Sequence, residues 1–189
     1  MFSMTINKAT PDDYREIVSC FSTAVETIED EKERAEVSET LLPELLSEIN
    51  EGHVYIAKMR NKGLGFALIS HSVEDSFFPQ THSFTKATNI LDSIDYKGEN
   101  VMVLRAIFVN SMHQRKGNGT EIIKSLFGRY PKSTWLCFAS QENKAAAKFL
   151  KANGFLSLGL DGSIEASKCP CIVYGKKYRP SGLCREAFW

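Results

Sequence analysis

Hydrophobic and polar positions alternate with different periods along the first fifty residues of the 189-residue chain. Residues 4–9, "MTINKA", predict a short strand. Thr10 and Pro11 are typical of a helix start, and apolar residues then recur at helical spacing as far as Ile28. The charged run "EDEKERAE" at 29–36 predicts a solvated break. A second helix is indicated by the apolar stripe Leu41, Leu42, Leu45, Leu46 and Ile49.

Residues 53–70 predict a β-hairpin. Two β-rich runs, "HVYIAKM" and "LGFALIS", are joined by "RNKG", in which Asn61 and Gly63 suit a tight turn. The following residues, 71–100, show no sustained period apart from a possible turn of helix at 88–94. A connection of this length is often functional or mobile. We expect it either to face a substrate or to be a plain insertion.

Two further strands, each followed by a helix, are predicted after this connection. "VMVLRAIFV" (101–109) and "STWLCFAS" (133–140) have the composition of buried strands. The first precedes a helix that ends before Pro131, with an apolar face formed by Ile122, Ile123, Leu126 and Phe127. The second precedes "QENKAAAKFLKANGF" (141–155), which predicts a helix that ends at its Asn-Gly pair.

The composition fits one globular domain without a net electrostatic field. Hydrophobic residues make up 43% of the chain, and 23 basic side chains balance 23 acidic ones. This balance, and the lack of interleaved basic and aromatic residues, disfavours nucleic-acid and membrane partners. The N-terminal residues lack the apolar core of a signal peptide, and no stretch approaches the roughly 18 apolar residues of a membrane span. We therefore expect a cytoplasmic protein.

Five cysteines are an odd number in a chain without a secretory signal, which favours free thiols over disulfides. Cys169 and Cys171 flank a proline, but neither a CxxC pair nor a nearby histidine completes a tetrahedral ligand set. The sequence therefore predicts no metal site.

The segment "HQRKGNGTEII" lies between a predicted strand and a predicted helix. Backbone N–H groups at a helix N-terminus have no intrahelical acceptor, and the helix dipole is positive there, so such a loop binds anions. Gly117 and Gly119 remove Cβ atoms that would hold a pyrophosphate away from the backbone. Thr120 adds a hydroxyl, and Arg115 or Lys116 adds a positive charge. Together these residues predict a phosphate-binding loop.

The spacing of this loop does not fit two common phosphate motifs. A P-loop requires Gly-x-x-x-x-Gly-Lys followed by Ser or Thr, and a dinucleotide fingerprint requires a third glycine where this chain has Ile122. The order Gln114-x-x-Gly117-x-Gly119 after "RAIFV" resembles the acyl-CoA pyrophosphate loop of the GNAT acetyltransferase superfamily. The later helix matches the family at Asn143, Ala146, Phe149, Gly154 and Phe155. The resemblance extends from residue 5 to about residue 178.

The resemblance implies an α+β fold whose mixed, mostly antiparallel central sheet has about six to seven strands, about four flanking helices and splayed central strands. It implies one domain over 1–189, with 71–100 as a long insertion between strands and 179–189 as a C-terminal tail. It also implies an N-acetyltransferase that uses acetyl-CoA to acetylate a primary amine of a small molecule or protein. The amine attacks directly in a ternary complex. We expect a monomer or a homodimer.

By the same resemblance, the pantetheine arm of the coenzyme is expected to hydrogen-bond with the backbone near Ile107 to Val109, and the pyrophosphate with the loop. The predicted coenzyme-binding residues are Ile107, Phe108, Val109, Gln114, Arg115, Lys116, Gly117, Asn118, Gly119, Thr120, Asn143, Ala146 and Phe149. The direct attack requires no covalent intermediate. Cys137 is therefore interpreted as a packing residue rather than a nucleophile.

The sequence departs from the family where catalysis is concerned. Leu150 stands where the family often has a tyrosine that protonates the leaving thiolate, and Val103 and Arg105 occupy positions at which a glutamate often acts as base. A hydrocarbon side chain cannot donate a proton. Four titratable residues remain as candidates, although each is of a type more often found at the surface: His53, His113, Glu99 and Glu142. The catalytic residues stay unassigned, and a coenzyme-binding module with weak or no catalytic activity stays open as the alternative.

Overall fold

The computed structural model describes residues 4–28, 31–71, 100–140, 143–157 and 171–176. The predicted insertion lies outside these residues except at its two ends, as do the helix expected within it and the C-terminal tail. The described residues belong to two compact units. One domain over the whole chain stays a prediction.

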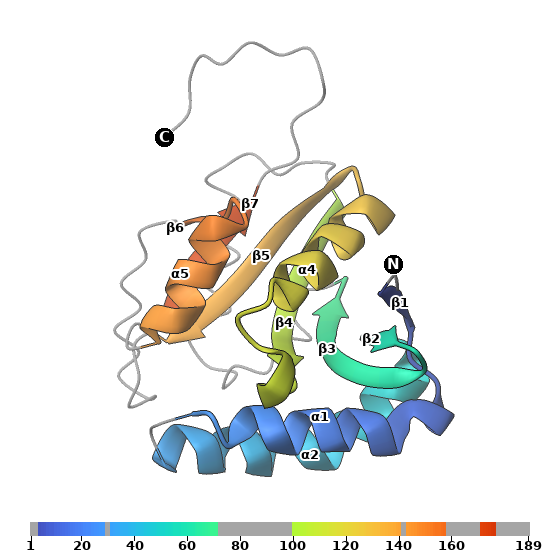
Figure 1. The fold of residues 1–189 in the computed structure, drawn as a ribbon. Coiled ribbons are helices and arrows are strands. Elements are labelled where there is room, and N and C mark those ends of the chain that lie inside the picture. Colours follow the sequence, from blue (N-terminus) through green and yellow to red (C-terminus); the bar gives the residue numbers. More distant parts are fainter. Residues whose placement is uncertain (1–3, 29–30, 72–99, 141–142, 158–170, 177–189) are drawn as a thin grey trace, which may run out of the picture. The chain divides into compact units, whose positions relative to one another are not determined.

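Seven strands and four α-helices are present among the described residues (Figure 1). The strands are β1 (Thr5–Lys8), β2 (Val54–Met59), β3 (Lys62–Ser70), β4 (Asn100–Val109), β5 (Ser133–Ser140), β6 (Leu156–Ser157) and β7 (Cys171–Lys176). The helices are α1 (Tyr14–Val25), α2 (Glu31–Glu51), α4 (Asn118–Arg129) and α5 (Lys144–Ala152), with short 3-10 helices η1 (Pro11–Asp13) and η2 (Ser111–His113). The strand order is β1-β2-β3-β4-β5-β7-β6, in a mostly antiparallel sheet. This confirms the predicted α+β fold class, while the splaying of the central strands stays a prediction.

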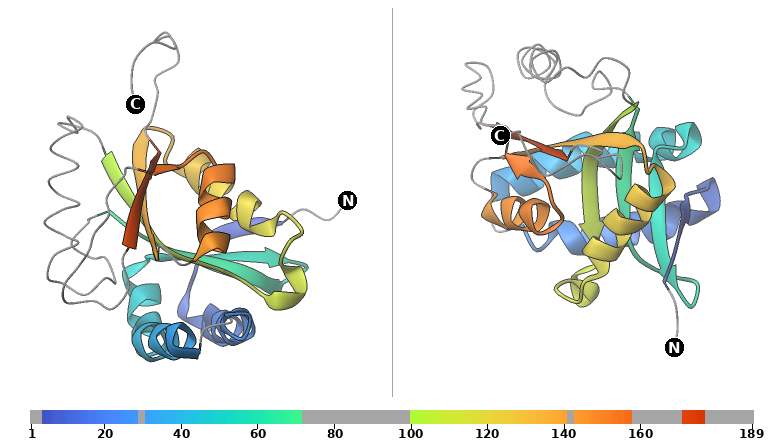
Figure 2. Two further views of the ribbon diagram at one scale, coloured as in Figure 1. Left: turned by 90° about the vertical axis from the view of Figure 1, so that its left-hand side faces the viewer. Right: turned by 90° about the horizontal axis from the view of Figure 1, so that it is seen from above.

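The first unit comprises the described residues within 4–70 and 104–128. In it, β1 pairs with β2 and β2 pairs with β3, both antiparallel, and the β2–β3 register ends with Met59 opposite Lys62. Helices α1 and α2 lie side by side on one face of these strands, and α4 lies on the opposite face (Figure 2). The part of β4 that leads into the glycine loop belongs to this unit.

The turn of the β2–β3 hairpin is made by Arg60 and Asn61, which have positive φ values of 52° and 60°. Two successive residues of positive φ are typical of the tight hairpin turn whose twist matches that of the strands. The expectation that Gly63 belongs to the turn is wrong, because this residue already lies in β3. A Cβ at Gly63 would lie 3.2 Å from Cys20 Sγ. This glycine therefore lets α1 approach the strand.

Helix α2 includes the charged run that was expected to be a break. The prediction is wrong from residue 31 onward because Glu, Lys, Arg and Ala are strong helix formers, so a charged run continues a helix readily. Three residues of the predicted apolar stripe are buried: Leu41, Leu45 and Ile49. Leu46 is 43% exposed, since the helical period turns it away from the covered face.

The core of the first unit contains an aromatic cluster of Phe21 from α1, Phe66 from β3 and Phe108 from β4. The rings of Phe21 and Phe108 meet edge to face with centroids 5.1 Å apart, and those of Phe66 and Phe108 stack at 5.3 Å. Phe108 belongs to the segment predicted to bind pantetheine. Because its side chain packs in the core, only its backbone groups are left for the predicted pantetheine contact.

The second unit contains β5, β6, β7 and α5. Strand β7 pairs antiparallel with both neighbours, with Trp135 opposite Lys176 and Leu156 opposite Gly175. Helix α5 ends as the sequence predicted, at an Asn-Gly pair in which Gly154 has a φ of 85°. Lys176 Nζ donates to the carbonyl oxygen of the preceding Asn153 at 2.9 Å, which ties β7 to the end of the helix.

Candidate active site

The predicted phosphate-binding loop joins the end of β4 to the start of α4 within the first unit. Arg115 and Gly117 have left-handed backbone conformations, with φ of 56° and 83°. Glycine adopts this conformation without a side-chain penalty, and a Cβ at Gly117 would meet nothing within 4 Å. The helix starts with a hydrogen bond from Glu121 N to Gly117 O of 3.0 Å. Open space therefore lies beside a helix N-terminus, where the first N–H groups lack intrahelical acceptors.

Gln114 braces this loop. Its Nε2 donates to the carbonyl oxygen of Val109 at 3.0 Å and to Thr27 Oγ1, two residues after the end of helix α1, at 3.3 Å. These bonds hold the beginning of the loop against the end of β4. The sequence marked Gln114 as a coenzyme contact, and the structure adds a positioning role that its spacing did not reveal.

Two more predicted loop residues bond to carbonyl groups of the preceding turn. Asn118 Nδ2 donates to His113 O at 2.7 Å, and Lys116 Nζ donates to Met112 O at 2.8 Å. These bonds fix the path of the chain into α4, whose first turn includes Gly119 and Thr120. The ammonium group of Lys116 stays beside the loop, where it favours an anion.

Strand β3 approaches the end of β4 closely at Gly65. A Cβ at this position would lie 2.4 Å from Phe108 O and 3.0 Å from Val109 Cα, so any larger residue requires the backbones to separate. Asn110 N donates to Leu64 O at 2.9 Å beside this contact. The segment predicted to bind pantetheine is thus positioned by β3. An isolated glycine in an apolar strand was the available sequence signal for such an approach.

The other predicted coenzyme contacts lie on α5, in the second unit. Asn143 Oδ1 accepts a hydrogen bond from Ala146 N at 2.9 Å, so the asparagine caps the helix. Phe149 is partly buried on the same helix. Leu150, which occupies the position of the family's tyrosine acid, is 2% exposed and packs as a core residue.

Cys137 is a buried free cysteine of β5. Burial raises the pKa of Cys137 to about 12, although its contact with the Phe138 carbonyl opposes this change. The thiolate is the nucleophilic form of cysteine, so the neutral thiol present near pH 7 is unreactive. This supports the interpretation of Cys137 as a packing residue. Cys20 is also a buried free cysteine, and burial raises its pKa to about 11.

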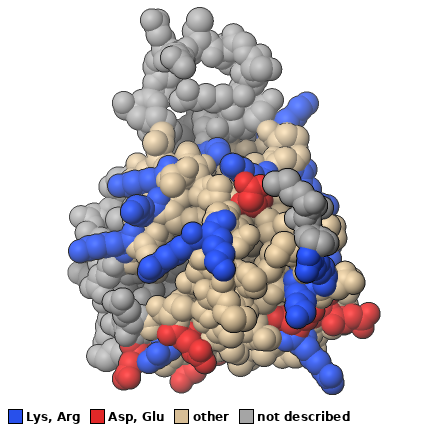
Figure 3. Space-filling model, viewed as in Figure 1, with Lys and Arg blue, Asp and Glu red and all other residues tan. Residues whose placement is uncertain are grey.

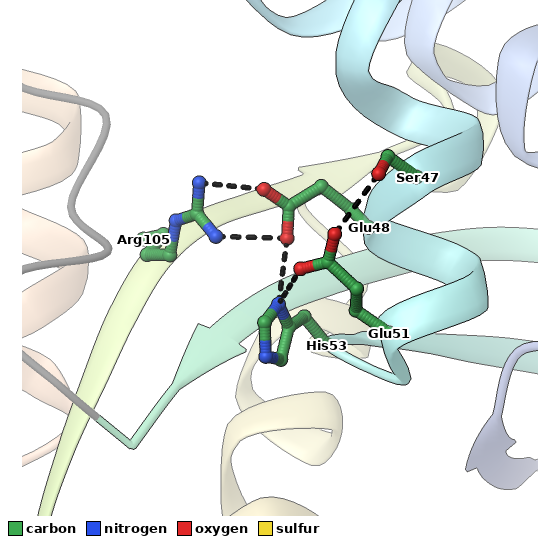
Figure 4. Close-up of polar contacts among 5 residues, drawn as sticks. All are labelled: Ser47, Glu48, Glu51, His53 and Arg105. Carbon is green, nitrogen blue, oxygen red and sulfur yellow. Dashed lines mark hydrogen bonds and ion pairs between the residues drawn. The ribbon is translucent and has the colours of Figure 1, made fainter.

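A buried ion-pair network reaches β4 two residues before Ile107. Arg105 Nη1 lies 2.8 Å from Glu48 Oε2, and Arg105 Nη2 lies 2.8 Å from Glu48 Oε1 (Figure 4). His53 Nδ1 lies 2.9 Å from Glu48 Oε2 and 3.5 Å from Glu51 Oε2. The side chains of Arg105 and Glu48 are 5% and 9% exposed, and that of His53 is 21% exposed.

The sequence pattern points to Arg105 and His53 but not to Glu48. Glu48 follows Leu41 by seven positions, so it interrupts the apolar stripe of α2 on the buried side. Arg105 likewise interrupts the apolar run of β4. Two opposite charges at buried positions of separate elements are the signal that could have paired them, because buried charges require partners.

The remaining sequence candidates are dispersed. His113 is partly buried in η2, and its carbonyl group accepts the bond from Asn118. Val103 is fully buried. Glu99 and Glu142 lie outside the described residues.

Glu48, Glu51 and His53 also form a group that a cation could bridge, since their ligand atoms lie within 4.8 Å of one another. The guanidinium of Arg105 already bonds to both oxygens of Glu48, and its charge repels a second cation at the same carboxylate. We therefore interpret the group as a hydrogen-bond network.

Charge is unevenly distributed despite the equal totals. Helix α5 carries Lys144, Lys148 and Lys151, spaced so that they share one side of the helix, and it contains no acidic residue. On the face shown in Figure 3, lysine and arginine side chains are widespread and acidic ones gather mainly along the lower edge. Local positive potential is therefore available to an anion without an overall positive charge.

No described helix combines the length and apolar composition needed to cross a bilayer.

The sequence matches the acetyltransferase (GNAT) family over residues 22–155. The match covers most of the chain, so the protein belongs to the GNAT family and is an acyltransferase. No match was found among curated protein sequences.

Solved structures support the fold. A GNAT-family acetyltransferase from Streptococcus agalactiae is 15% identical, with a TM-score of 0.64, over 95% of this chain and 99% of that one. The PaiA N-acetyltransferase of Thermoplasma acidophilum, in complex with coenzyme A, is 15% identical, with a TM-score of 0.63, over 93% and 99%. The ribosomal-protein-S18-alanine N-acetyltransferase of Escherichia coli is 14% identical, with a TM-score of 0.58, over 99% and 100%.

Proposed function

We propose that the protein is an N-acetyltransferase that transfers an acetyl group from acetyl-CoA to a primary amine of a small molecule or protein. The observation that carries the proposal is the open space beside Gly117 at the N-terminus of α4. Membership of an acyltransferase family favours this function over a coenzyme-binding module without catalysis.

In this proposal, the pyrophosphate accepts hydrogen bonds from backbone N–H groups of residues 117–120, where the helix dipole adds positive potential. Thr120 adds its hydroxyl group, and the side chains of Arg115 and Lys116 supply positive charge. The backbone of 107–109 holds the pantetheine arm. The α5 residues predicted to contact the coenzyme remain part of the proposal: Asn143, Ala146 and Phe149.

The reaction is a direct acyl transfer. The amine nitrogen attacks the thioester carbonyl carbon, a backbone N–H stabilises the oxyanion that develops, and the C–S bond breaks. A coenzyme thiol is a good leaving group because its pKa is close to the roughly 8.5 of a cysteine, so the buried Leu150 need not be replaced by an acid. The acceptor must enter as a neutral amine, which requires that its ammonium form lose a proton.

Acetyl-CoA binding tests the proposal. At about 100 times its dissociation constant, the coenzyme adds roughly 2.7 kcal/mol to the free energy of unfolding and raises the melting temperature. Gly119→Asp abolishes this increase, because its carboxylate repels the pyrophosphate. Gly128→Asp is the matched control, since it introduces the same charge about 13 Å further along the helix. Equal binding by both folded variants would contradict the loop assignment.

Turnover tests the acceptor class. A panel comprising a simple alkylamine, a polyamine and a peptide with N-terminal alanine covers small-molecule and protein amines. The peptide is included because one structural relative is an alanine N-acetyltransferase. Release of free thiol that depends on one of these amines is the expected result, and coenzyme binding without any turnover would favour the binding-module alternative.

A further inference from the structure

The arrangement around His53 fixes which ring nitrogen carries the proton. Its Nδ1 lies 2.9 Å from Glu48 Oε2 and 3.5 Å from Glu51 Oε2. An ionised carboxylate only accepts hydrogen bonds, so Nδ1 donates and a neutral ring keeps Nε2 as an unprotonated acceptor. Nε2 makes no hydrogen bond to any described residue, and Figure 4 shows it on the side of the ring away from the two carboxylates.

Glu48 is held in place from the opposite side. The bidentate pair with Arg105 fixes the plane of the carboxylate, because the guanidinium presents two parallel N–H donors. His53 is also anchored through its backbone, whose carbonyl oxygen accepts a bond from Ile69 N at 3.0 Å. The charged described residues that face the imidazole are Glu48 and Glu51 of α2, with Arg105 of β4 behind Glu48.

This network reaches the strand that carries the proposed pantetheine contacts. Arg105 precedes Ile107 by two residues on β4, and two residues of a strand span about 7 Å. Arg105, Glu48, His53 and the segment 107–109 all belong to the first unit. A partly exposed imidazole, oriented by a buried carboxylate, is thus linked to the strand that carries the proposed pantetheine contacts.

We propose that His53 is the general base of the acyl transfer, with Glu48 as the residue that positions it and Arg105 as the residue that holds Glu48. This inference rests on the proposed acetyltransferase function. The acceptor ammonium gives one proton to His53 Nε2, and the resulting amine forms the C–N bond with the acetyl carbon. The C–S bond breaks and its electron pair leaves with sulfur. The second proton lost from nitrogen neutralises the thiolate, and His53 returns its proton to solvent.

The same reasoning explains how the chain functions without a glutamate on β4. An acidic residue is present at this strand, but it comes from α2 and bonds to the arginine that occupies the strand position. The carboxylate is therefore neutralised by Arg105 and acts on the imidazole rather than on the substrate. A histidine oriented in this way presents its other ring nitrogen, Nε2, as the proton acceptor.

The test compares His53→Gln with Glu44→Gln. Glu44 is the matched control because it is an exposed glutamate one turn before Glu48 on the same helix. For each variant and the wild type, acetyl-CoA binding and kcat/KM against pH are measured with the same amine panel. Two amines of different pKa are included, because an acidic limb that falls at the same pH for both belongs to the enzyme.

The expected result is a loss of roughly 10²- to 10⁴-fold in kcat/KM for His53→Gln, with disappearance of the shared acidic limb and unchanged acetyl-CoA affinity. Glu44→Gln stays within a few-fold of wild type. A weakly basic amine, neutral at the assay pH, loses less activity with His53→Gln than a strongly basic one. Glu48→Gln moves the shared limb, whereas a purely structural role would change stability alone.

Several outcomes overturn the inference. If wild type acetylates an amine and a folded His53→Gln keeps the shared limb, His53 is not the base although the proposed function stands. If acetyl-CoA does not bind, the proposed function is contradicted, and the inference that rests on it is overturned as well. Coenzyme binding without turnover of any panel amine also overturns the inference. A ¹⁵N spectrum of the wild-type imidazole that shows the proton on Nε2 would overturn it without any variant.

Discussion

Arg105 of β4 and Glu48 of α2 form a bidentate ion pair although 57 positions separate them in the chain. Both nitrogen–oxygen distances are 2.8 Å, and both side chains are almost fully buried. The pair connects the strand that leads into the glycine loop with the helix that ends beside His53. A buried ion pair contributes little net stability over a packed apolar pair, so its main physical effect is to fix geometry.

Removing one partner of this pair is expected to destabilise the folded protein strongly. Arg105→Met leaves Glu48 buried without its counter-charge and lowers the free energy of unfolding by about 3–5 kcal/mol. Urea unfolding measures the loss. The double variant Arg105→Met with Glu48→Leu is the control and recovers most of the stability, since it removes both charges. A double variant as unstable as the single one would contradict this account.

Gly65 is expected to tolerate no side chain. Gly65→Ala places a Cβ 2.4 Å from the Phe108 carbonyl oxygen, which lowers the free energy of unfolding by about 1–3 kcal/mol through backbone displacement. Gly128→Ala is the matched control, because a Cβ there meets nothing within 4 Å and alanine favours the helix by up to about 1 kcal/mol. The denaturation midpoint is expected to fall for Gly65→Ala and to rise for Gly128→Ala, relative to wild type. A neutral Gly65→Ala would show that β3 and β4 separate freely.

The ion pair between Asp13 and Lys58 is expected to make stability depend on acid pH. Burial alone would raise the pKa of Asp13, but hydrogen bonds from Lys58 and Thr10 outweigh it and lower this pKa below its ordinary 3.8. A lowered folded-state pKa means that the stabilisation is complete above the unfolded-state value and is lost as pH falls through the folded-state value.

Asp13→Asn should therefore lower the free energy of unfolding by on the order of 1 kcal/mol at pH 7. Once the pH is below the lowered pKa of Asp13, the substitution should change this free energy very little. Urea midpoints of both proteins from pH 7 to pH 2 provide the measurement. The pair also raises the pKa of Lys58, chiefly through its hydrogen bond with Asp13, so its contribution is lost again at strongly alkaline pH. A stability difference that stays constant down to pH 2 would contradict the assignment.

Leu150 is expected to act only through packing. Leu150→Ala lowers the free energy of unfolding by roughly 2–5 kcal/mol, because the side chain is 2% exposed and leaves a cavity. The pH profile of turnover in the folded fraction stays unchanged. Leu150→Tyr raises the rate at neutral pH only if its hydroxyl reaches the sulfur and proton transfer limits turnover. A folded Leu150→Ala with a shifted pH profile would show that the position takes part in the chemistry.

Predictions that depend only on residues close together in the sequence agree well with the structure. The β2–β3 hairpin, the helix after the glycine loop and the Asn-Gly end of α5 follow from hydrophobic period and glycine conformation. The errors are also local. The start of α2 was placed too late because a charged run has high helix propensity, and the hairpin turn falls on Arg60 and Asn61 because the register of the strands selects it.

The sequence by itself determined the order of strand, glycine loop and helix, since residues 107–120 are contiguous and their conformations depend on local sterics and hydrogen bonds. Only the tertiary structure decided what surrounds them. The contact of Gly65 with Phe108, the brace from Gln114 to Thr27 and the pairing of Glu48 with Arg105 each join segments that are distant in the chain. Packing of α1 and α2 against the strands brings these groups together, and no periodicity within one segment records which partner another segment supplies.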